Sequence, residues 1–292
     1  MRPSLRCALV LWLFACTSTP SRGQQTFDRS TEPFVSANGR DTLGCDFYMP
    51  HNPIHPGWGV IFLHGGGFYA GSREGEAGQF YCSALAERGI SVLSMDYRLR
   101  QIGKGFHCDV SIQDKREAIR WAAEDLMAAI DAFSGYFPEG IIAAGTSAGA
   151  EAVLDAVYAL RLSSLDGAIS LAGGVEPPQV WRNTPILAVH GTCDALVPYC
   201  IDLHHYCPAE SAGALLLAGG GGMANAGANV DLYSFQYAGH ELSTSMLTDE
   251  FFIEQSIAFI NAVATRTFEA HSSNIPLYRP CSLSQHPEPR CQ

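Results

Sequence analysis

The sequence predicts an α/β fold with a mainly parallel central sheet and helices on both faces. Two observations predict it. Apolar runs of strand length alternate along the chain with longer segments of helical periodicity, which is the order that a covered parallel sheet requires. The 292 residues are 47% hydrophobic and 16% charged, so the chain has the composition of a folded protein and the length of one large domain.

Each element follows from its own pattern. Short apolar runs predict strands at 41–49, 59–63, 90–96, 140–144, 168–171, 186–189 and 230–237. Apolar residues at helical spacing predict helices at 76–88, 109–133, 148–160 and 251–264. The longest of these helices carries Ile119, Met127 and Ile130 among its apolar residues.

Two stretches fit this alternation poorly. Residues 212–228 are apolar, but four consecutive glycines interrupt them and they are too short to span a membrane, so we expect a surface loop with a short helical piece. Residues 271–292 are rich in Pro and Ser, and we expect a tail that lies over the domain at 24–270. The tail has no hydrophobic end of the kind that a glycolipid anchor needs.

The first residues have the pattern of a targeting segment. A short basic stretch precedes the ten-residue apolar run from Cys7 to Cys16, which is typical of a signal peptide at 1–23 that is cleaved after Gly23. This predicts a secreted protein. A second interpretation is a bacterial lipobox ending at Cys16, which would leave the mature protein lipid-anchored through that cysteine.

The cysteine count agrees with an oxidising compartment. Removal of Cys7 and Cys16 from the ten cysteines leaves an even number, which favours disulfides. Zinc is the rival explanation, but these cysteines lack the spacing of a zinc site, so we expect no metal. Cys200 with Cys207 and Cys281 with Cys291 are candidate pairs only because they are close in sequence. The connectivity stays open among Cys45, Cys82, Cys108, Cys193, Cys200, Cys207, Cys281 and Cys291.

The charge limits the partners. The net charge is −11, from 18 basic and 29 acidic residues. Proteins that bind nucleic acid or anionic membranes present basic patches, and this sequence lacks them. We therefore expect neither partner and no stable membrane span, and the oligomeric state is left open.

The segment Gly-Thr-Ser-Ala-Gly stands between a predicted strand and a predicted helix. This is the setting of a nucleophile elbow, in which small neighbours allow a sharp turn that exposes the serine oxygen. Ser147 is therefore the candidate nucleophile. The competing interpretation is an ordinary serine at a helix N-cap.

A second glycine-rich segment, His-Gly-Gly-Gly, follows the strand at 59–63. Glycines in a row are useful where backbone N–H groups must come close to a ligand. We expect the N–H groups of Gly65, Gly66 and Ala148 to form an oxyanion hole. His64 is expected to make structural hydrogen bonds and not to act as a base.

An acid and a base follow two later strands. Asp194 lies in the loop after 186–189 and His240 follows 230–237, so the chain order is serine, aspartate, histidine. A neutral His240 would take the serine proton, and Asp194 would hold the imidazole in the required tautomer. Glu176, after the strand at 168–171, is the second candidate for the acid.

Several other polar residues receive structural interpretations. We expect Glu151 to interact with the N-terminus of its helix, and Asp202, His204 and His205 to form a solvated surface. His190 and a disulfide at Cys193 are expected to order the loop of Asp194. The group at 96–98, Asp-Tyr-Arg, is expected to be a buried polar brace.

Together these motifs resemble the α/β-hydrolase superfamily. HGGGF, MDYRL, GTSAG and HGTCDALVP are similar to those of secreted feruloyl and acetylxylan esterases and of hormone-sensitive-lipase-like esterases. The resemblance implies an α/β-hydrolase fold and a serine esterase that needs no cofactor, with a small-molecule or carbohydrate ester as substrate. The alternatives are a lipase or another small-ester carboxylesterase, a prolyl-oligopeptidase-like peptidase, and a non-catalytic binding protein.

Overall fold

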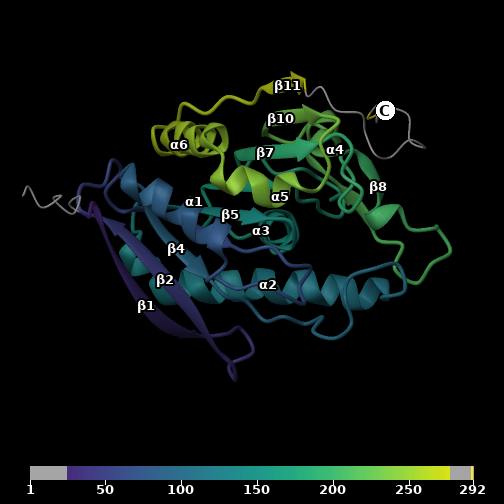
Figure 1. Ribbon diagram of the computed structural model, residues 1–292, viewed down its shortest axis with the longest axis horizontal. Helices are drawn as coiled ribbons and strands as arrows, with labels where there is room; N and C mark the ends of the chain where they lie inside the picture. The colour runs from purple at the N-terminus through teal and green to yellow at the C-terminus, as the bar shows by residue number, and fades with distance from the viewer. Residues whose placement is uncertain (1–24, 277–290, 292) are drawn as a thin grey trace, which may run out of the picture.

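A computed structural model describes residues 25–276 and residue 291 of the chain (Figure 1). In these residues the central sheet has nine strands in the order β1-β2-β4-β3-β5-β6-β7-β10-β11. The strands are β1 Phe27–Val35, β2 Thr42–Pro50, β3 Trp58–Leu63, β4 Ser91–Met95, β5 Gly140–Thr146, β6 Gly167–Leu171, β7 Ile186–Gly191, β10 Val230–Gln236 and β11 Ser272–Pro276. The strands from β4 to β11 in this order run parallel, and only β1 and β2 add antiparallel pairs. The predicted mainly parallel sheet is confirmed.

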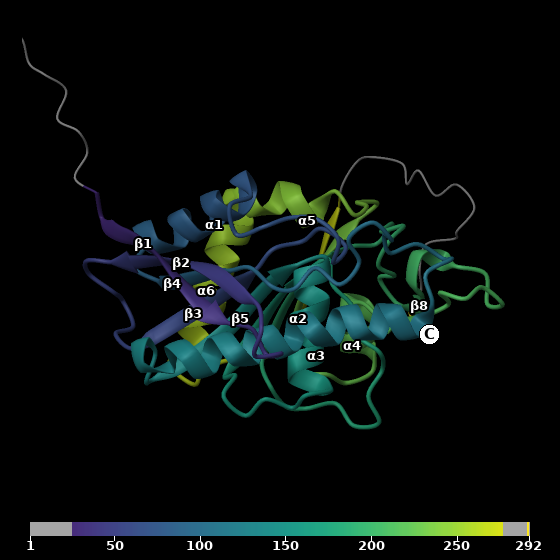
Figure 2. The same ribbon diagram turned by 90° about the horizontal axis from the view of Figure 1, so that it is seen from below.

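Helices cover both faces of the sheet (Figures 1 and 2). One face carries α1 Glu76–Glu87, α5 Leu242–Ser245 and α6 Glu250–Ala264, and the other carries α2 Ile112–Phe133, α3 Ala148–Tyr158 and α4 Gly220–Asn225. Each layer buries its own apolar cluster against the sheet, with Leu85 of α1 in one cluster and Leu126 of α2 in the other. Smaller elements are the 3-10 helices η1 Ser134–Tyr136, η2 His204–Tyr206 and η3 Met246–Thr248, and the strands β8 Ile201–Leu203 and β9 Leu216–Ala218.

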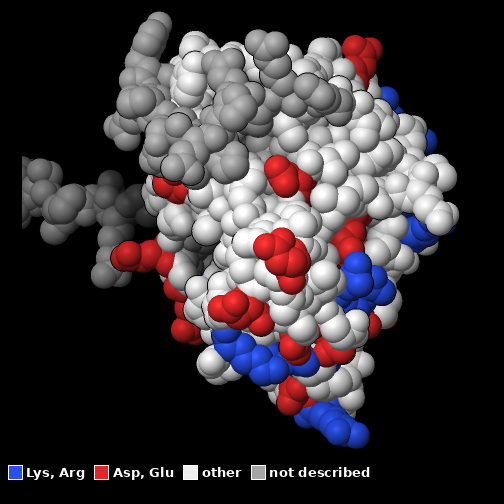
Figure 3. Space-filling view, turned by 90° about the vertical axis from the view of Figure 1, so that its right-hand side faces the viewer, with Lys and Arg blue, Asp and Glu red and all other residues white. Residues whose placement is uncertain are grey.

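Acidic and basic side chains lie next to each other on the surface. Figure 3 shows one face of the molecule, on which Lys and Arg side chains contact Asp and Glu side chains in the lower part. Ion pairs of this kind tie α2 to its surroundings, since Arg100 contacts Asp114 and Glu117 over 2.9 and 2.8 Å. Partly exposed pairs like these contribute modest stability individually.

The structure of the segment at 212–228 differs from the prediction. It contains β9 and α4, and Gly220, Gly221, Gly222 and Met223 are buried, so the expected surface loop is wrong while its short helical piece is present. The glycines allow a close approach, because a Cβ atom at Gly221 would lie 2.3 Å from the ring of Tyr199. The structure of this region depends on close packing against the main chain, and the pattern of apolar residues in the sequence does not reveal such packing.

Two strands of the sheet were not expected. β1 exposes all of its side chains except a few, such as the buried Phe34, so it lacks an apolar signal. β11 lies within the segment predicted as a tail and pairs in parallel with β10. Both are held by backbone hydrogen bonds at opposite edges of the sheet.

The disulfides differ from the expected pairs. Cys108 bonds Cys207 and Cys200 bonds Cys291, so both candidate pairs of sequence neighbours are wrong. Cys193 is also disulfide-bonded, as expected for the loop of Asp194.

Two of the cysteines for which the even count favours disulfides form none. Cys45 and Cys82 are free and buried. They belong to different apolar clusters on opposite faces of the sheet, so they cannot pair with each other. Cys281 lies outside the described residues, as do the predicted signal segment and lipobox at 1–23. No helix among the described residues is long and apolar enough to cross a bilayer.

Candidate active site

Ser147 stands in a sharp turn between β5 and α3. Its φ of 50° and ψ of −121° are unusual for a residue with a side chain, and its N–H group donates to the carbonyl oxygen of Leu171 over 2.9 Å. Gly149 makes the turn possible, because a Cβ atom there would lie 2.3 Å from the carbonyl oxygen of Leu63. The turn is therefore pressed against the end of β3 and presents the serine oxygen outward.

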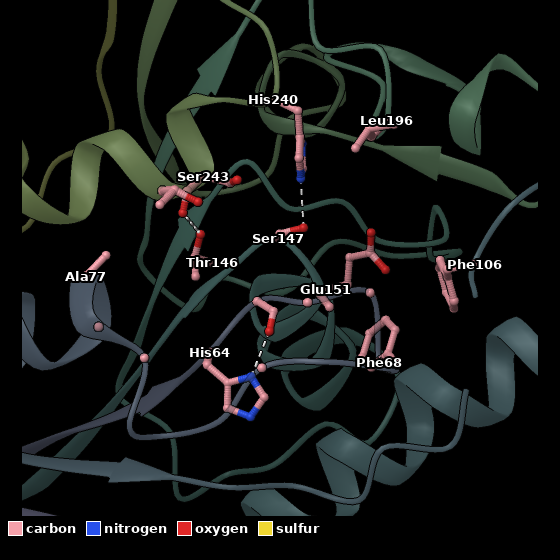
Figure 4. A pocket seen from close by; sticks show the side chains of 18 of the residues that line it. His64, Phe68, Ala77, Phe106, Thr146, Ser147, Glu151, Leu196, His240 and Ser243 are labelled. Atoms are coloured by element: carbon pink, nitrogen blue, oxygen red, sulfur yellow. Dashed lines mark hydrogen bonds between the residues drawn. The ribbon is translucent and has the colours of Figure 1, made fainter. Parts of the chain in front are cut away.

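Three side chains from separate loops form one line of hydrogen bonds, and Figure 4 shows the one between Ser147 and His240. The Oγ atom of Ser147 lies 2.8 Å from Nε2 of His240, and Nδ1 of His240 lies 2.7 Å from Oδ2 of Asp194. These loops follow β5, β7 and β10 at the carboxyl edge of the parallel sheet. The structure thus brings together three residues that are up to 93 positions apart in sequence.

The other oxygen of Asp194 is fixed by its own loop. Oδ1 accepts from the N–H groups of Leu196 and Val197, each over 2.9 Å. Burial acts to raise the pKa of Asp194, but hydrogen bonds from His190 and His240 outweigh it and hold the pKa below its usual value. Asp194 is therefore an ionised acceptor with a fixed orientation at neutral pH.

His190 forms hydrogen bonds that hold the loop of Asp194. Its Nδ1 accepts from the N–H group of Gly220 over 3.1 Å, so the ring proton is on Nε2. Nε2 lies 3.1 Å from the carbonyl oxygen of Val197 and 3.5 Å from Oδ2 of Asp194.

The His-Gly-Gly-Gly segment lies beside Ser147. A Cβ atom at Gly65 would be only 3.4 Å from the Cβ of Ser147, so this backbone reaches the serine closely because it has no side chain. Within the described residues the N–H groups of Gly65, Gly66 and Ala148 make no hydrogen bond to another backbone group. These three donors are available to a ligand.

His64 faces away from the serine and orders the loop. Its Nδ1 donates to the carbonyl oxygen of Gly65 over 2.7 Å, and its ring stacks on Tyr97 with centroids 4.3 Å apart. The Tyr97 hydroxyl donates back to the carbonyl oxygen of His64 over 2.8 Å. Burial lowers the pKa of His64, so the ring is neutral at pH 7.

A cavity of about 980 Å³ opens over the serine. Its wall includes the three proposed donors, His240, and the apolar side chains of Phe68 and Phe106. A space of this size accepts a substrate much larger than an acetate ester.

Three residues of this wall were missed or misjudged from the sequence. Glu151, expected to serve as a partner of the helix N-terminus, is only 2% exposed and lines the cavity. His204 and His205 also line it, and His204 is 2% exposed, so the expected solvated surface is wrong for them. The spacing of four residues between Ser147 and Glu151 could have placed both on one face of the helix, whereas no local signal marks the histidines.

The second candidate acid lies elsewhere. Glu176 pairs with Arg116, its carboxylate oxygens lying 2.9 and 2.6 Å from the guanidinium, and it makes no contact with His240. The group at 96–98 forms buried polar contacts as expected, since Arg98 donates to Asp125 over 2.9 Å. No group of three possible metal ligands is found among the described residues.

Comparisons with known proteins also indicate similarity to esterases. Residues 45–172 match the BD-FAE family model. No curated protein matches the chain.

The solved structures that are similar in fold include three esterases. Brefeldin A esterase, a bacterial homologue of human hormone-sensitive lipase, is 15% identical with a TM-score of 0.55, over 90% of this chain and 81% of that one. A truncated carbohydrate esterase from gut microbiota is 18% identical with a TM-score of 0.53, over 83% of this chain and 98% of that one. Esterase 2 of Thermogutta terrifontis is 19% identical with a TM-score of 0.52, over 80% of this chain and 94% of that one.

The chain therefore has the α/β-hydrolase fold. The segment from β2 to the end of β6 is similar to the BD-FAE family.

Proposed function

We propose that this chain hydrolyses carboxylic esters through an acyl-enzyme, with Ser147 as nucleophile, His240 as general base and Asp194 as the supporting acid. One observation carries the proposal: the unbroken line of hydrogen bonds from Ser147 through His240 to Asp194, at the floor of a large cavity. The similarity to esterases and to the BD-FAE family model supports the same class of reaction.

The first half of the reaction forms the acyl-enzyme. Oγ of Ser147 attacks the carbonyl carbon while its proton passes to Nε2 of His240, and Asp194 stabilises the imidazolium that results. The oxyanion of the tetrahedral intermediate accepts hydrogen bonds from the N–H groups of Gly65, Gly66 and Ala148. Each such donor typically contributes about 3 kcal/mol to transition-state stabilisation.

The second half releases the acid. His240 gives its proton to the leaving alkoxide, which departs as an alcohol. A water molecule then gives a proton to His240 and attacks the acyl carbon, and collapse of this second intermediate returns the proton to Ser147. Every step uses groups of the chain itself and water, so no cofactor is required.

We further propose acetyl or feruloyl esters of plant-wall carbohydrate as the substrate class. The supporting observations are the similarity of residues 45–172 to the BD-FAE family and a cavity large enough for a bulky acyl or sugar group. A carbohydrate esterase is among the structures with this fold.

A panel of substrates tests the function. Wild type should turn over p-nitrophenyl acetate and react covalently with a fluorophosphonate, and Ser147→Ala should do neither. Full activity in Ser147→Ala would overturn the assignment of the nucleophile. Absence of labelling in wild type would favour a binding protein, and cleavage of prolyl peptides but not esters would favour a peptidase.

Secretion is also part of the proposal. The disulfides Cys108–Cys207 and Cys200–Cys291 agree with an oxidising compartment. Expression of the full chain followed by N-terminal sequencing should find Gln24 as the first residue of the mature protein. A lipid-modified Cys16 at the N-terminus would instead support the anchored form.

A further inference from the structure

The carboxyl group of Glu151 points into the active-site cavity. In Figure 4 it lies between Ser147 on one side and the rings of Phe68 and Phe106 on the other. The side chain is 2% exposed, yet its Oε2 atom is buried without a hydrogen-bond partner among the described residues. The proposed triad does not use it.

The surroundings of Glu151 are polar on one side only. Nζ of Lys115, which is fully buried, donates to the carbonyl oxygen of Gly213 over 2.8 Å and lies 3.4 Å from Nδ1 of His204. A lysine ammonium only donates, so Nδ1 of His204 accepts and the ring proton is on Nε2. That Nε2 atom lies 3.7 Å from Oε1 of Glu151. Oε1 therefore faces a donor beyond hydrogen-bond distance, and Oε2 is buried without a partner among the described residues.

A buried carboxyl group with a purely structural role has hydrogen-bond partners for both oxygens in this protein. Asp125 of α2 is also fully buried, and both of its oxygens are paired. They accept from the N–H group of Ala37 over 3.0 Å, from the N–H group of Arg98 over 2.8 Å and from its guanidinium over 2.9 Å. Buried polar groups normally find such partners, so an unpaired oxygen at a cavity wall indicates a partner that comes from the ligand.

The charged groups around Glu151 favour an uncharged ligand. Burial raises the pKa of Glu151 to about 8, which Lys115 opposes and Asp194 reinforces. Burial also lowers the pKa of His204 well below its usual value, so this ring is neutral. A ligand cation would be repelled by Lys115, and a ligand anion would meet a carboxyl group. An uncharged hydroxyl group satisfies the carboxyl group in either protonation state, because it both donates and accepts.

We infer that Glu151 is a specificity-determining residue of this cavity and that its carboxyl group binds a hydroxyl group of the substrate, beside the rings of Phe68 and Phe106. The inference rests on the proposed ester hydrolysis, because the hydroxyl group is carried by the ester. His204, which contacts Lys115, lies 3.7 Å from the carboxyl group.

Matched pairs of esters test the inference. The acyl pair is methyl 4-hydroxyphenylacetate and methyl phenylacetate, and the alcohol pair is the acetates of tyrosol and 2-phenylethanol. Wild type should prefer the hydroxylated member of at least one pair about tenfold or more in kcat/KM, as expected for a buried hydrogen bond to a carboxyl group. Glu151→Leu should reduce this ratio to about one, with little change for the ester that lacks the hydroxyl group.

Two further variants keep this test interpretable. Glu151→Gln keeps the shape and a hydrogen-bonding amide, so it should retain part of the preference even if the leucine variant folds poorly. Glu176→Gln removes an exposed carboxylate outside the cavity and should keep the wild-type ratio. No preference in wild type for either pair, or an unchanged ratio in a folded Glu151→Leu enzyme, would overturn the inference.

A binding measurement separates this inference from the proposed function. Ser147→Ala and Ser147→Ala with Glu151→Leu are titrated calorimetrically with tyrosol and with 2-phenylethanol, which involves no catalysis. Tighter binding of tyrosol to the first variant and equal binding of both alcohols to the second supports the role of Glu151, even in a chain without esterase activity. Equal binding of the two alcohols to Ser147→Ala counts against it.

Discussion

The backbone N–H group of Glu151 donates to the carbonyl oxygen of Ser147 over 2.9 Å. The first turn of α3 thus fixes the proposed nucleophile and the buried carboxyl relative to each other. Because both belong to one rigid turn, a ligand hydroxyl bound at Glu151 would be held at a constant distance from the serine oxygen. The proposed binding of the hydroxyl group and the proposed reaction would therefore be coupled through a single hydrogen-bonded turn of backbone.

The buried Glu151 should make stability depend on pH. Its pKa is raised from 4.5 to about 8 by burial, so the folded state holds this proton more tightly than the unfolded state. The contribution of the protonated Glu151 to the free energy of unfolding is complete below about pH 4.5 and is lost as the pH rises toward 8. The slope is up to about 1.4 kcal/mol per pH unit. Urea unfolding of wild type and Glu151→Gln between pH 5 and 9 measures this difference. The free energy of unfolding of Glu151→Gln should increase relative to that of wild type as the pH rises. Parallel pH profiles of this free energy for the two proteins would contradict the raised pKa.

Asp194→Asn should reduce kcat strongly without unfolding the protein. An amide in this position can present its N–H group to His240 and favour the wrong imidazole tautomer, which lowers turnover by a factor on the order of 10⁴ in triads of this type. Steady-state hydrolysis of p-nitrophenyl acetate gives the value. The matched control is Glu176→Gln, which should keep kcat within about twofold. A similar loss in both variants would show that Asp194 has no special place in the reaction.

Gly149→Ala should damage the turn that carries Ser147. The new methyl group would lie 2.3 Å from the carbonyl oxygen of Leu63, and backbone atoms cannot move aside cheaply. We expect a loss of stability of about 1–3 kcal/mol, typical of overpacking, together with a fall in kcat. Gly135→Ala is the control, since nothing lies within 4 Å of its added Cβ. Equal melting temperatures and equal kcat for the two variants would refute the close contact.

The disulfide between Cys108 and Cys207 should support the polar wall of the cavity. It joins the loop of Phe106 to the end of the segment that carries His204, across 99 residues of sequence. Replacement of both cysteines by serine should lower stability by about 4 kcal/mol and weaken the preference for hydroxylated esters. The double serine variant of Cys200 and Cys291 should also melt earlier but retain that preference. Thermal melts and the matched ester pairs distinguish the two, and a preserved preference in both would contradict the prediction.

The elements that sequence reasoning predicted well share one property: each carries a strong local signal. Strands such as β5 and helices such as α2 are marked by apolar runs and by helical spacing, and the predicted bounds differ from the observed ones by a few residues. Short glycine-rich motifs at strand ends likewise mark the positions of Gly65 and Ser147, because tight turns restrict which residues fit.

What the sequence did not reveal depends on distant contacts. His204 enters the cavity because η2 is tied to the loop before α2, and a pair of adjacent histidines looks like surface in isolation. β11 contains no apolar run and joins the sheet through its backbone. The free state of Cys45 and Cys82 is decided by the sheet that separates them, which a count of cysteines cannot show.

The bond between Cys200 and Cys291 orders events during biosynthesis. Cys200 lies shortly after Asp194, and its partner follows 91 residues later. A ribosome therefore has to translate β10, α6 and β11 before this covalent link can form. The nascent polypeptide can pair its earlier strands while it is still being made, but the region that carries the proposed catalytic acid is locked only afterwards, by an oxidation step.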